Sequence, residues 1–173
     1  MAHRFACLHP EMLAAAASIS GSIPRDRSCA PKIPISYLQV FGDKDTITPI
    51  NGKVSSDGWF YEKLEISFNK WAESMGCTED LEASNLLTAE SNNLICTSRR
   101  SCSKGRSLEV INCLVPDGGH AWPGQKPGVG FCRSKEQGTS IPNQKECLDN
   151  NGKEINWGNE VIWEFFNKHR RES

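Results

Sequence analysis

The sequence predicts an α/β protein with a short, mostly parallel sheet of about three strands and flanking helices. Two runs rich in β-forming residues, 35–41 and 108–115, indicate buried strands, and Gly42 ends the first. Two other segments, 57–75 and 159–169, repeat apolar residues at helical spacing. Because strands and helices alternate along the chain, we expect parallel strands with helices packed against their faces.

The first part of the chain supplies a further helix and an ambiguous segment. Residues 1–9 have helical periodicity that stops at Pro10, and the apolar residues of one face are Met1, Phe5 and Leu8. The alanine-rich run 12–20 fits a helix or a short buried strand, and the sequence leaves both open. A proline-bearing connection, 24–34, then leads to the strand predicted over 35–41.

The middle of the chain contains the clearest helical pattern. Within 57–75 an apolar stripe predicts a core-facing helix, and Gly76 is the expected C-cap; the stripe consists of Trp59, Leu64, Phe68 and Trp71. Residues 78–107 are polar, and we expect irregular structure there. The stretch 124–156 is a loop of unusual length, which favours a functional or disulfide-stapled segment.

Composition bounds the class of protein. The 173 residues suit one domain, and the net charge of −1 gives no reason to expect nucleic acid or an anionic membrane as partner. The basic clusters 99–100 and 169–171 are interpreted as solvated surface. The sequence has no apolar run long enough for a transmembrane helix, and the run 12–19 is too short for a signal peptide.

Eight cysteines indicate disulfides and an extracellular or periplasmic protein. A zinc site is the rival interpretation, but the sequence contains no Cys-x-x-Cys pair and its histidines are widely separated, so we expect no metal. Cys132 and Cys147 flank the long loop and are predicted to pair. Cys77, after the middle helix, is predicted to pair with Cys102 or Cys96.

Candidate functional residues follow the two predicted strands. His120 stands in the turn Gly-Gly-His-Ala-Trp-Pro-Gly after the second strand, and Asp45 follows the first. Carboxyl ends of strands are where open α/β sheets place functional groups, and histidine is the usual general acid–base near neutral pH. The alternatives are a structural turn histidine and a turn aspartate that bonds its own backbone; Asp43 fits the second better than Asp45.

Three blocks of the sequence, 1–11, 41–49 and 118–124, resemble the polyhydroxybutyrate depolymerase and feruloyl esterase family of α/β-hydrolases. The resemblance covers nearly the whole chain, although Phe41 stands where the family usually has histidine. It implies that Asp45 and His120 are the acid and base of a Ser-Asp-His triad. Trp122 and Trp59 could then line an acyl pocket.

The same resemblance implies that a part is missing. In that family a Gly-x-Ser-x-Gly elbow carries the nucleophile just before a helix like residues 1–9, and no such motif occurs in these 173 residues. We therefore expect a partial α/β-hydrolase domain over 1–173, the C-terminal half of an exported serine esterase without cofactor, inactive alone. Its partners would be the N-terminal half and a polyester or plant cell-wall ester, and which ester stays open. The unpaired strand near 14–20 would favour association.

Two other interpretations remain. The chain could be a non-catalytic, disulfide-stapled binding module that kept this half of the fold. Alternatively, another residue such as Ser22 or Cys113 could serve as the nucleophile. An upstream Gly-x-Ser-x-Gly in the same reading frame would separate the esterase from the binding module.

Overall fold

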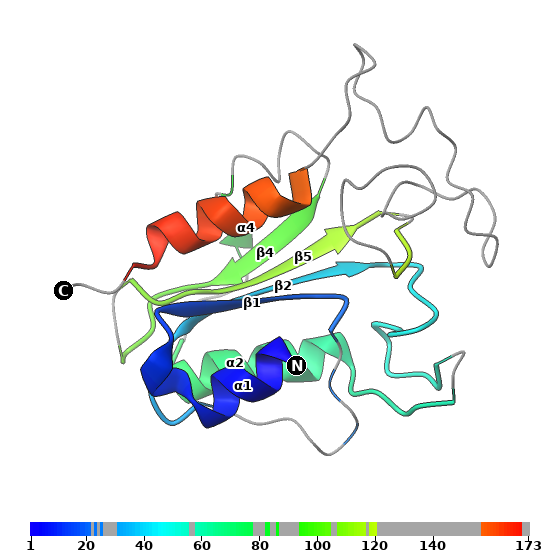
Figure 1. The fold of residues 1–173 in the computed structure, drawn as a ribbon, viewed down its shortest axis with the longest axis horizontal. Helices are drawn as coiled ribbons and strands as arrows, with labels where there is room; N and C mark the ends of the chain where they lie inside the picture. The colour runs from blue at the N-terminus through cyan, green and yellow to red at the C-terminus, as the bar shows by residue number, and fades with distance from the viewer. Residues whose placement is uncertain are drawn as a thin grey trace, which may run out of the picture.

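The computed structural model shows a sheet between two layers of helices (Figure 1). Helices α1 and α2 cover one face of the sheet, and α4 covers the other. The structure describes residues 1–21, 23, 25, 31–55, 58–77, 82–83, 86, 94–104, 107–116, 118–120 and 157–170. The α/β class predicted from the sequence is therefore confirmed.

The elements follow one another in a mixed order of helices and strands. They are α1 (Ala2–Leu8), the short 3-10 helix η1 (Pro10–Met12), β1 (Ala15–Ile19), β2 (Ser36–Gly42), α2 (Leu64–Met75), β3 (Glu82–Ala83), β4 (Ile95–Arg99), β5 (Val110–Val115) and α4 (Trp157–Lys168). The sheet has five strands in the order β1-β2-β5-β4-β3. The β1–β2 and β2–β5 pairs are parallel, and the β5–β4 and β4–β3 pairs are antiparallel. The expectation of a mostly parallel sheet of about three strands was wrong.

The sequence predicted neither β3 nor β4, which lie within the segment expected to be irregular, and the longer of the two is β4. Its residues Ile-Cys-Thr-Ser-Arg carry only one β-branched aliphatic side chain, so the hydrophobic signal for a strand is weak. Pairing with β5 places Cys96 opposite Cys113, and the two form a disulfide. This tertiary link holds a strand that local propensity does not specify.

The alanine-rich run near the start is a strand, which decides between the two structures left open. β1 pairs with β2, with Ala16 opposite Tyr37, and its alanines belong to the cores on both faces of the sheet, Ala15 with α4 and Ala16 with α1. In the described part of the chain β1 has a strand neighbour on one side only. It therefore forms one edge of the sheet, as expected from the sequence.

Helix α1 buries the face opposite to its apolar stripe. Its buried residues are His3, Ala6 and Cys7; the exposed apolar residues of the stripe and of the following turn are Met1, Phe5, Leu8 and Met12. The His3 ring packs 4.9 Å from the Trp71 ring, and its Nδ1 lies 3.2 Å from the Tyr37 hydroxyl. Burial lowers the pKa of His3 to about 4, so this histidine is neutral at pH 7.

Helix α2 ends as predicted but begins later. Gly76 caps it with φ 66°, a left-handed conformation that suits glycine. The helix starts at Leu64, and before it the Trp59 N–H donates to Ser55 Oγ at 2.9 Å. Trp59 therefore lies before the helix, and the residue is 60% exposed.

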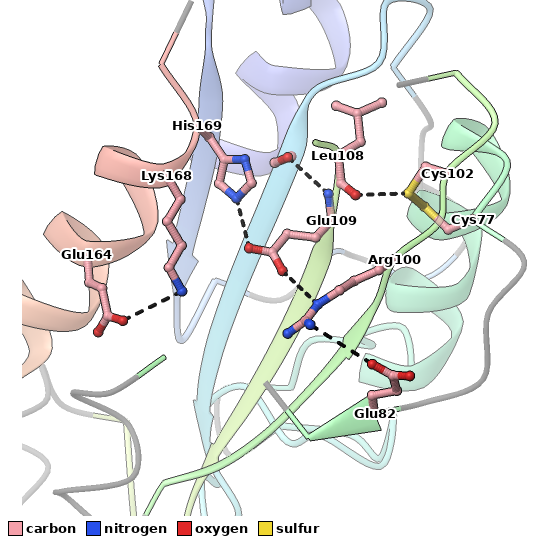
Figure 2. A network of polar contacts seen from close by, with 10 residues as sticks. Cys77, Glu82, Arg100, Cys102, Leu108, Glu109, Glu164, Lys168 and His169 are labelled. Carbon is pink, nitrogen blue, oxygen red and sulfur yellow. Dashed lines mark hydrogen bonds and ion pairs between the residues drawn. A yellow bond between two sulfur atoms is a disulfide. The ribbon is translucent and has the colours of Figure 1, made fainter. Parts of the chain in front are cut away.

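Helix α4 is held at its end by a buried polar network at the amino end of β5 (Figure 2). His169 Nε2 lies 2.9 Å from Glu109 Oε1, and Arg100 Nε lies 3.3 Å from Glu109 Oε2 as an ion pair without hydrogen-bond geometry. Burial alone would raise the pKa of Glu109, but the hydrogen bond from His169 and the charges around it lower it. The interpretation of His169 as solvated surface was wrong, since its side chain is 7% exposed.

Two disulfides lie wholly within the described residues. Cys77 pairs with Cys102, which confirms the first of its two predicted partners. The predicted pair Cys132–Cys147 lies outside the described residues. Among the cysteines that the structure describes none is free. No helix within the described ranges is long and apolar enough to span a membrane.

Candidate active site

The two predicted site residues meet beyond the carboxyl ends of adjacent strands. β2 and β5 run parallel, so their carboxyl ends lie at the same edge of the sheet. Asp45 follows β2 by three residues, His120 follows β5 by five, and His120 Nδ1 lies 2.9 Å from Asp45 Oδ2. The two residues are 75 positions apart in sequence, so the fold brings them together.

The carboxylate of Asp45 is buried and surrounded by donors. Its Oδ1 accepts the backbone N–H groups of Ile47 and Thr48, each at 2.8 Å, and its Oδ2 accepts the Thr48 hydroxyl at 2.6 Å. Burial alone would raise the pKa of Asp45, but the hydrogen bonds from His120 and Thr48 outweigh it and lower the pKa. The group is therefore ionised at neutral pH, although its side chain has no exposed surface.

The ionised carboxylate fixes the tautomer of the histidine. An ionised carboxylate only accepts hydrogen bonds, so the proton between the pair belongs to His120 Nδ1. In the neutral imidazole, Nε2 then carries the lone pair and can accept a proton. The His120 side chain is 37% exposed, so this buried carboxylate orients a histidine that lies at the surface.

A close contact between two loops sets the position of the pair. Lys44 N–H donates to the Gly118 carbonyl at 2.9 Å, and Asp43 N–H donates to the Val115 carbonyl at 3.2 Å. A Cβ on Gly42 would lie 2.2 Å from the Gly118 oxygen, so only glycine allows the loops to approach this closely.

The two glycines of the histidine turn differ in the space around them. Neither Gly118 nor Gly119 has positive φ. A Cβ on Gly118 would lie 2.9 Å from the Val115 side chain, whereas a Cβ on Gly119 would meet nothing within 4 Å. Gly118 is therefore needed for its small size, and positive φ is not the reason.

The remaining sequence candidates have different outcomes. Trp59 lies on the exposed loop before α2 and is described without any contact to His120. Trp122 and Ser22 lie outside the described residues. Cys113 is oxidised in the disulfide with Cys96, so the hypothesis that it is a nucleophile was wrong.

Two residues of the site were not assigned a role from the sequence. Thr48 contacts both members of the pair, and Gly42 permits the loop contact beside it. The sequence signal that could have indicated Thr48 was its position three residues after the aspartate, within reach of the same turn. The expectation that Asp43 would be the self-bonding turn aspartate was also wrong, because Asp45 bonds the N–H groups of its own turn as well as His120.

The site has no arrangement for a metal within the part of the chain that the structure describes. No group of three or more histidine, cysteine, aspartate or glutamate side chains is placed to hold an ion there. The chemistry open to the described residues is that of an oriented imidazole base with a buried carboxylate.

Comparison with known proteins finds a similarity to a protein that is named as an esterase. Over 135 residues the chain is 30% identical to the protein named "Putative esterase NocK" of Nocardia uniformis subsp. tsuyamanensis. The match covers 72% of this chain and 39% of that protein, so the chain spans well under half the length of this relative. No family model matches the chain. The chain is thus similar in sequence to a protein named as an esterase. This agrees with the resemblance of the three sequence blocks to ester-cleaving α/β-hydrolases only at the level of an esterase.

Proposed function

We propose that this chain supplies the acid and the base of a serine carboxylester hydrolase. The observation that carries the proposal is the 2.9 Å contact of His120 with buried Asp45, at the carboxyl ends of two adjacent parallel strands. Similarity to an esterase-named protein gives independent support. In this proposal the nucleophilic serine comes from outside the 173 residues, which contain no Gly-x-Ser-x-Gly.

In the proposed reaction His120 Nε2 accepts the proton of the serine as its oxygen attacks the ester carbonyl. Asp45 keeps the neutral ring in the tautomer with the proton on Nδ1 and stabilises the imidazolium that forms. The imidazolium then gives the proton to the leaving alcohol, and an acyl-enzyme remains. In the second half of the cycle His120 takes a proton from a water molecule as the water attacks the acyl carbonyl. The proton then returns to the serine oxygen as the carboxylic acid leaves.

The surface of the chain offers a place for the other half. β1 is an edge strand, and the exposed apolar side chains of α1 and η1 lie in the layer next to it (Figure 1). Exposed apolar groups beside an open strand edge are typical of a surface that another segment covers. We propose that the part carrying the serine joins there, adding a strand next to β1.

The finer assignment rests on the three sequence blocks that resemble polyhydroxybutyrate depolymerases and feruloyl esterases. On that basis the substrate is a polyester or a plant cell-wall ester, and its acyl-pocket candidates are Trp122 and Trp59, of which Trp59 is exposed. The two disulfides agree with oxidative folding, and we propose an extracellular or periplasmic location.

The first experiment compares this chain with a longer polypeptide that includes the upstream coding sequence. The 173-residue chain should show no hydrolysis of p-nitrophenyl acetate or methyl ferulate and no labelling by a fluorophosphonate, because both need an activated serine. The longer polypeptide should hydrolyse an ester and be labelled at one serine. Labelling of the short chain, or an inactive longer polypeptide, would refute the proposal.

Matched variants of the longer polypeptide test the acid. Asp45→Asn should lower kcat by roughly 10⁴-fold, because the amide no longer holds the reactive tautomer of His120. Asp43→Asn removes a carboxylate two residues away that makes no described contact with His120, and it should leave kcat within about threefold. Equal losses in both variants would argue against the assignment of Asp45.

A further inference from the structure

The hydroxyl of Thr48 contacts three groups that come from the ends of three neighbouring strands. Its Oγ1 lies 2.6 Å from Asp45 Oδ2, which follows β2, and 3.2 Å from His120 Nδ1, which follows β5. It also lies 3.2 Å from the carbonyl oxygen of Ser20, directly after β1. These strands are consecutive in the sheet, so one hydroxyl joins the ends of β1, β2 and β5.

The distances assign the single proton of this hydroxyl. An O–H···O⁻ bond of 2.6 Å is a short, charge-assisted one, so the proton points to Asp45 Oδ2. The lone pairs of Thr48 Oγ1 then face the N–H of His120 Nδ1, which is shared between a strong acceptor and this weaker one. The Ser20 carbonyl is a second acceptor for the same proton.

The surroundings hold the hydroxyl in this place. Thr48 is 5% exposed, and its backbone N–H donates to Asp45 Oδ1 at 2.8 Å. A β-branched side chain has few allowed rotamers, so a fixed backbone also fixes the position of its hydroxyl. Ser20 has φ 47°, a conformation that is uncommon for a residue with a side chain. The backbone of the turn after β1 is thus unusual at the residue that meets Thr48.

We propose that Thr48 is a positioning residue of the Asp45–His120 pair, which locks the imidazole plane against the carboxylate and ties both to the end of β1. The inference rests on the proposed function for its catalytic meaning. The geometric part concerns this chain alone and needs no nucleophile.

The decisive experiment observes the His120 Nδ1–H proton by NMR in the 173-residue chain with ¹⁵N-labelled histidine. In the unaltered chain we expect a downfield resonance that exchanges slowly with water. Thr48→Val keeps nearly the same volume and both backbone hydrogen bonds of the turn, and it should broaden or abolish this resonance. The carboxyl of Asp45 should also titrate at higher pH in this variant, because it has lost a hydrogen bond to its ionised form.

Two variants serve as controls. Thr48→Ser retains the hydroxyl and should restore both the resonance and the titration of Asp45. Thr46→Val makes the same chemical change at an exposed threonine in the same turn, and it should have no effect. If Thr48→Val does not fold, Thr48→Ala tests the same loss of the hydroxyl with a smaller side chain. A resonance and a titration unchanged in the folded variant would overturn the proposal.

Activity in the longer polypeptide separates this inference from the proposed function. Thr48→Val should lower kcat about tenfold with KM nearly constant, the size expected for one hydrogen bond to a charged group. If His120→Ala abolishes activity and Thr48→Val changes neither kcat nor the resonance, the esterase stands and the role of Thr48 falls. If no esterase activity exists, the NMR result still decides the positioning role.

Discussion

The molecule contains two histidine–carboxylate pairs with the same 2.9 Å separation, at opposite ends of the sheet. Both carboxylates are buried, which alone would raise the pKa, and both have a lowered pKa because the hydrogen bond from histidine and the other donors or charges together outweigh burial. The pairs differ in what surrounds the histidine. The His120 side chain is 37% exposed, whereas that of His169 is 7% exposed.

The second difference lies in the other partners of each carboxylate. Glu109 also faces the cation of Arg100, which in turn lies 3.9 Å from Glu82 (Figure 2). Asp45 has only neutral donors besides its histidine among the described contacts. Glu109 therefore links the ends of α4 and β4 through His169 and Arg100, whereas Asp45 orients one accessible ring. A separation of 2.9 Å alone does not distinguish a structural pair from a catalytic one.

Removing each histidine should give the largest contrast. In the longer polypeptide, His120→Ala should lower kcat by roughly 10⁴-fold or more, because the general base is lost. His169→Ala should leave kcat within about threefold once folding is verified, and it should lower the melting temperature. Ester hydrolysis under saturating substrate and a thermal melt make the comparison, which fails if the two variants lose activity equally.

Neutralising each carboxylate should affect stability in the opposite order from activity, with the larger loss of unfolding free energy at Glu109. Glu109→Gln should cost about 3 kcal/mol of unfolding free energy, because it leaves half-buried Arg100 without its counter-charge and buried His169 without its carboxylate partner. Asp45→Asn should cost less, since water can solvate His120. Urea denaturation of the 173-residue chain at pH 7 measures both, and an equal loss would show that the two pairs are energetically equivalent.

The pH dependence of stability follows from the direction of the pKa shift of Glu109. A carboxyl whose folded pKa lies below its unfolded value of about 4.3 contributes stability above that pH and loses it as the pH falls through the folded pKa. The unaltered chain should therefore lose stability from about pH 5 downward, and Glu109→Gln should flatten this slope. An unchanged slope would mean that Glu109 does not hold a lowered pKa.

The smallest effect that we predict concerns the backbone of the site. Gly42→Ala should cost about 2 kcal/mol and disturb the NMR signals of His120, because the new methyl group would overlap the Gly118 carbonyl. Gly119→Ala makes the same change in the histidine turn, where the new group meets nothing within 4 Å. It should leave both stability and the signals nearly unchanged. Similar costs for both variants would contradict the loop contact described for the site.

The sequence was most informative where residues repeat with a clear period or end at a glycine. The strands β2 and β5, the C-cap at Gly76 and the helix α4 follow from local patterns. Asp45 and His120 were placed at strand ends, and the geometry brings them together. Their catalytic role stays a prediction.

The features that the sequence did not predict depend on distant partners. β4 has a weak local signal and is held by pairing with β5 and by the Cys96–Cys113 disulfide. In the sequence His169 belongs to a basic tail. Its partner Glu109 lies 60 residues earlier, and only the fold shows that the two are in contact. The contact of Thr48 with Ser20 likewise joins turns after two different strands. No spacing rule reveals such contacts.

The two edges of the sheet differ in what they can accept. β3 is two residues long and presents Glu82, which is ion-paired with Arg100, so this edge is too short and too charged to serve as a template. β1 offers five residues, Ala-Ala-Ala-Ser-Ile, without a charge. Two copies that meet through β1 in a two-fold arrangement would use up the only receptive edge that each has among its described strands. Self-association by pairing of these strands would therefore close at a dimer, with no receptive edge of the described sheet left from which a fibre could grow.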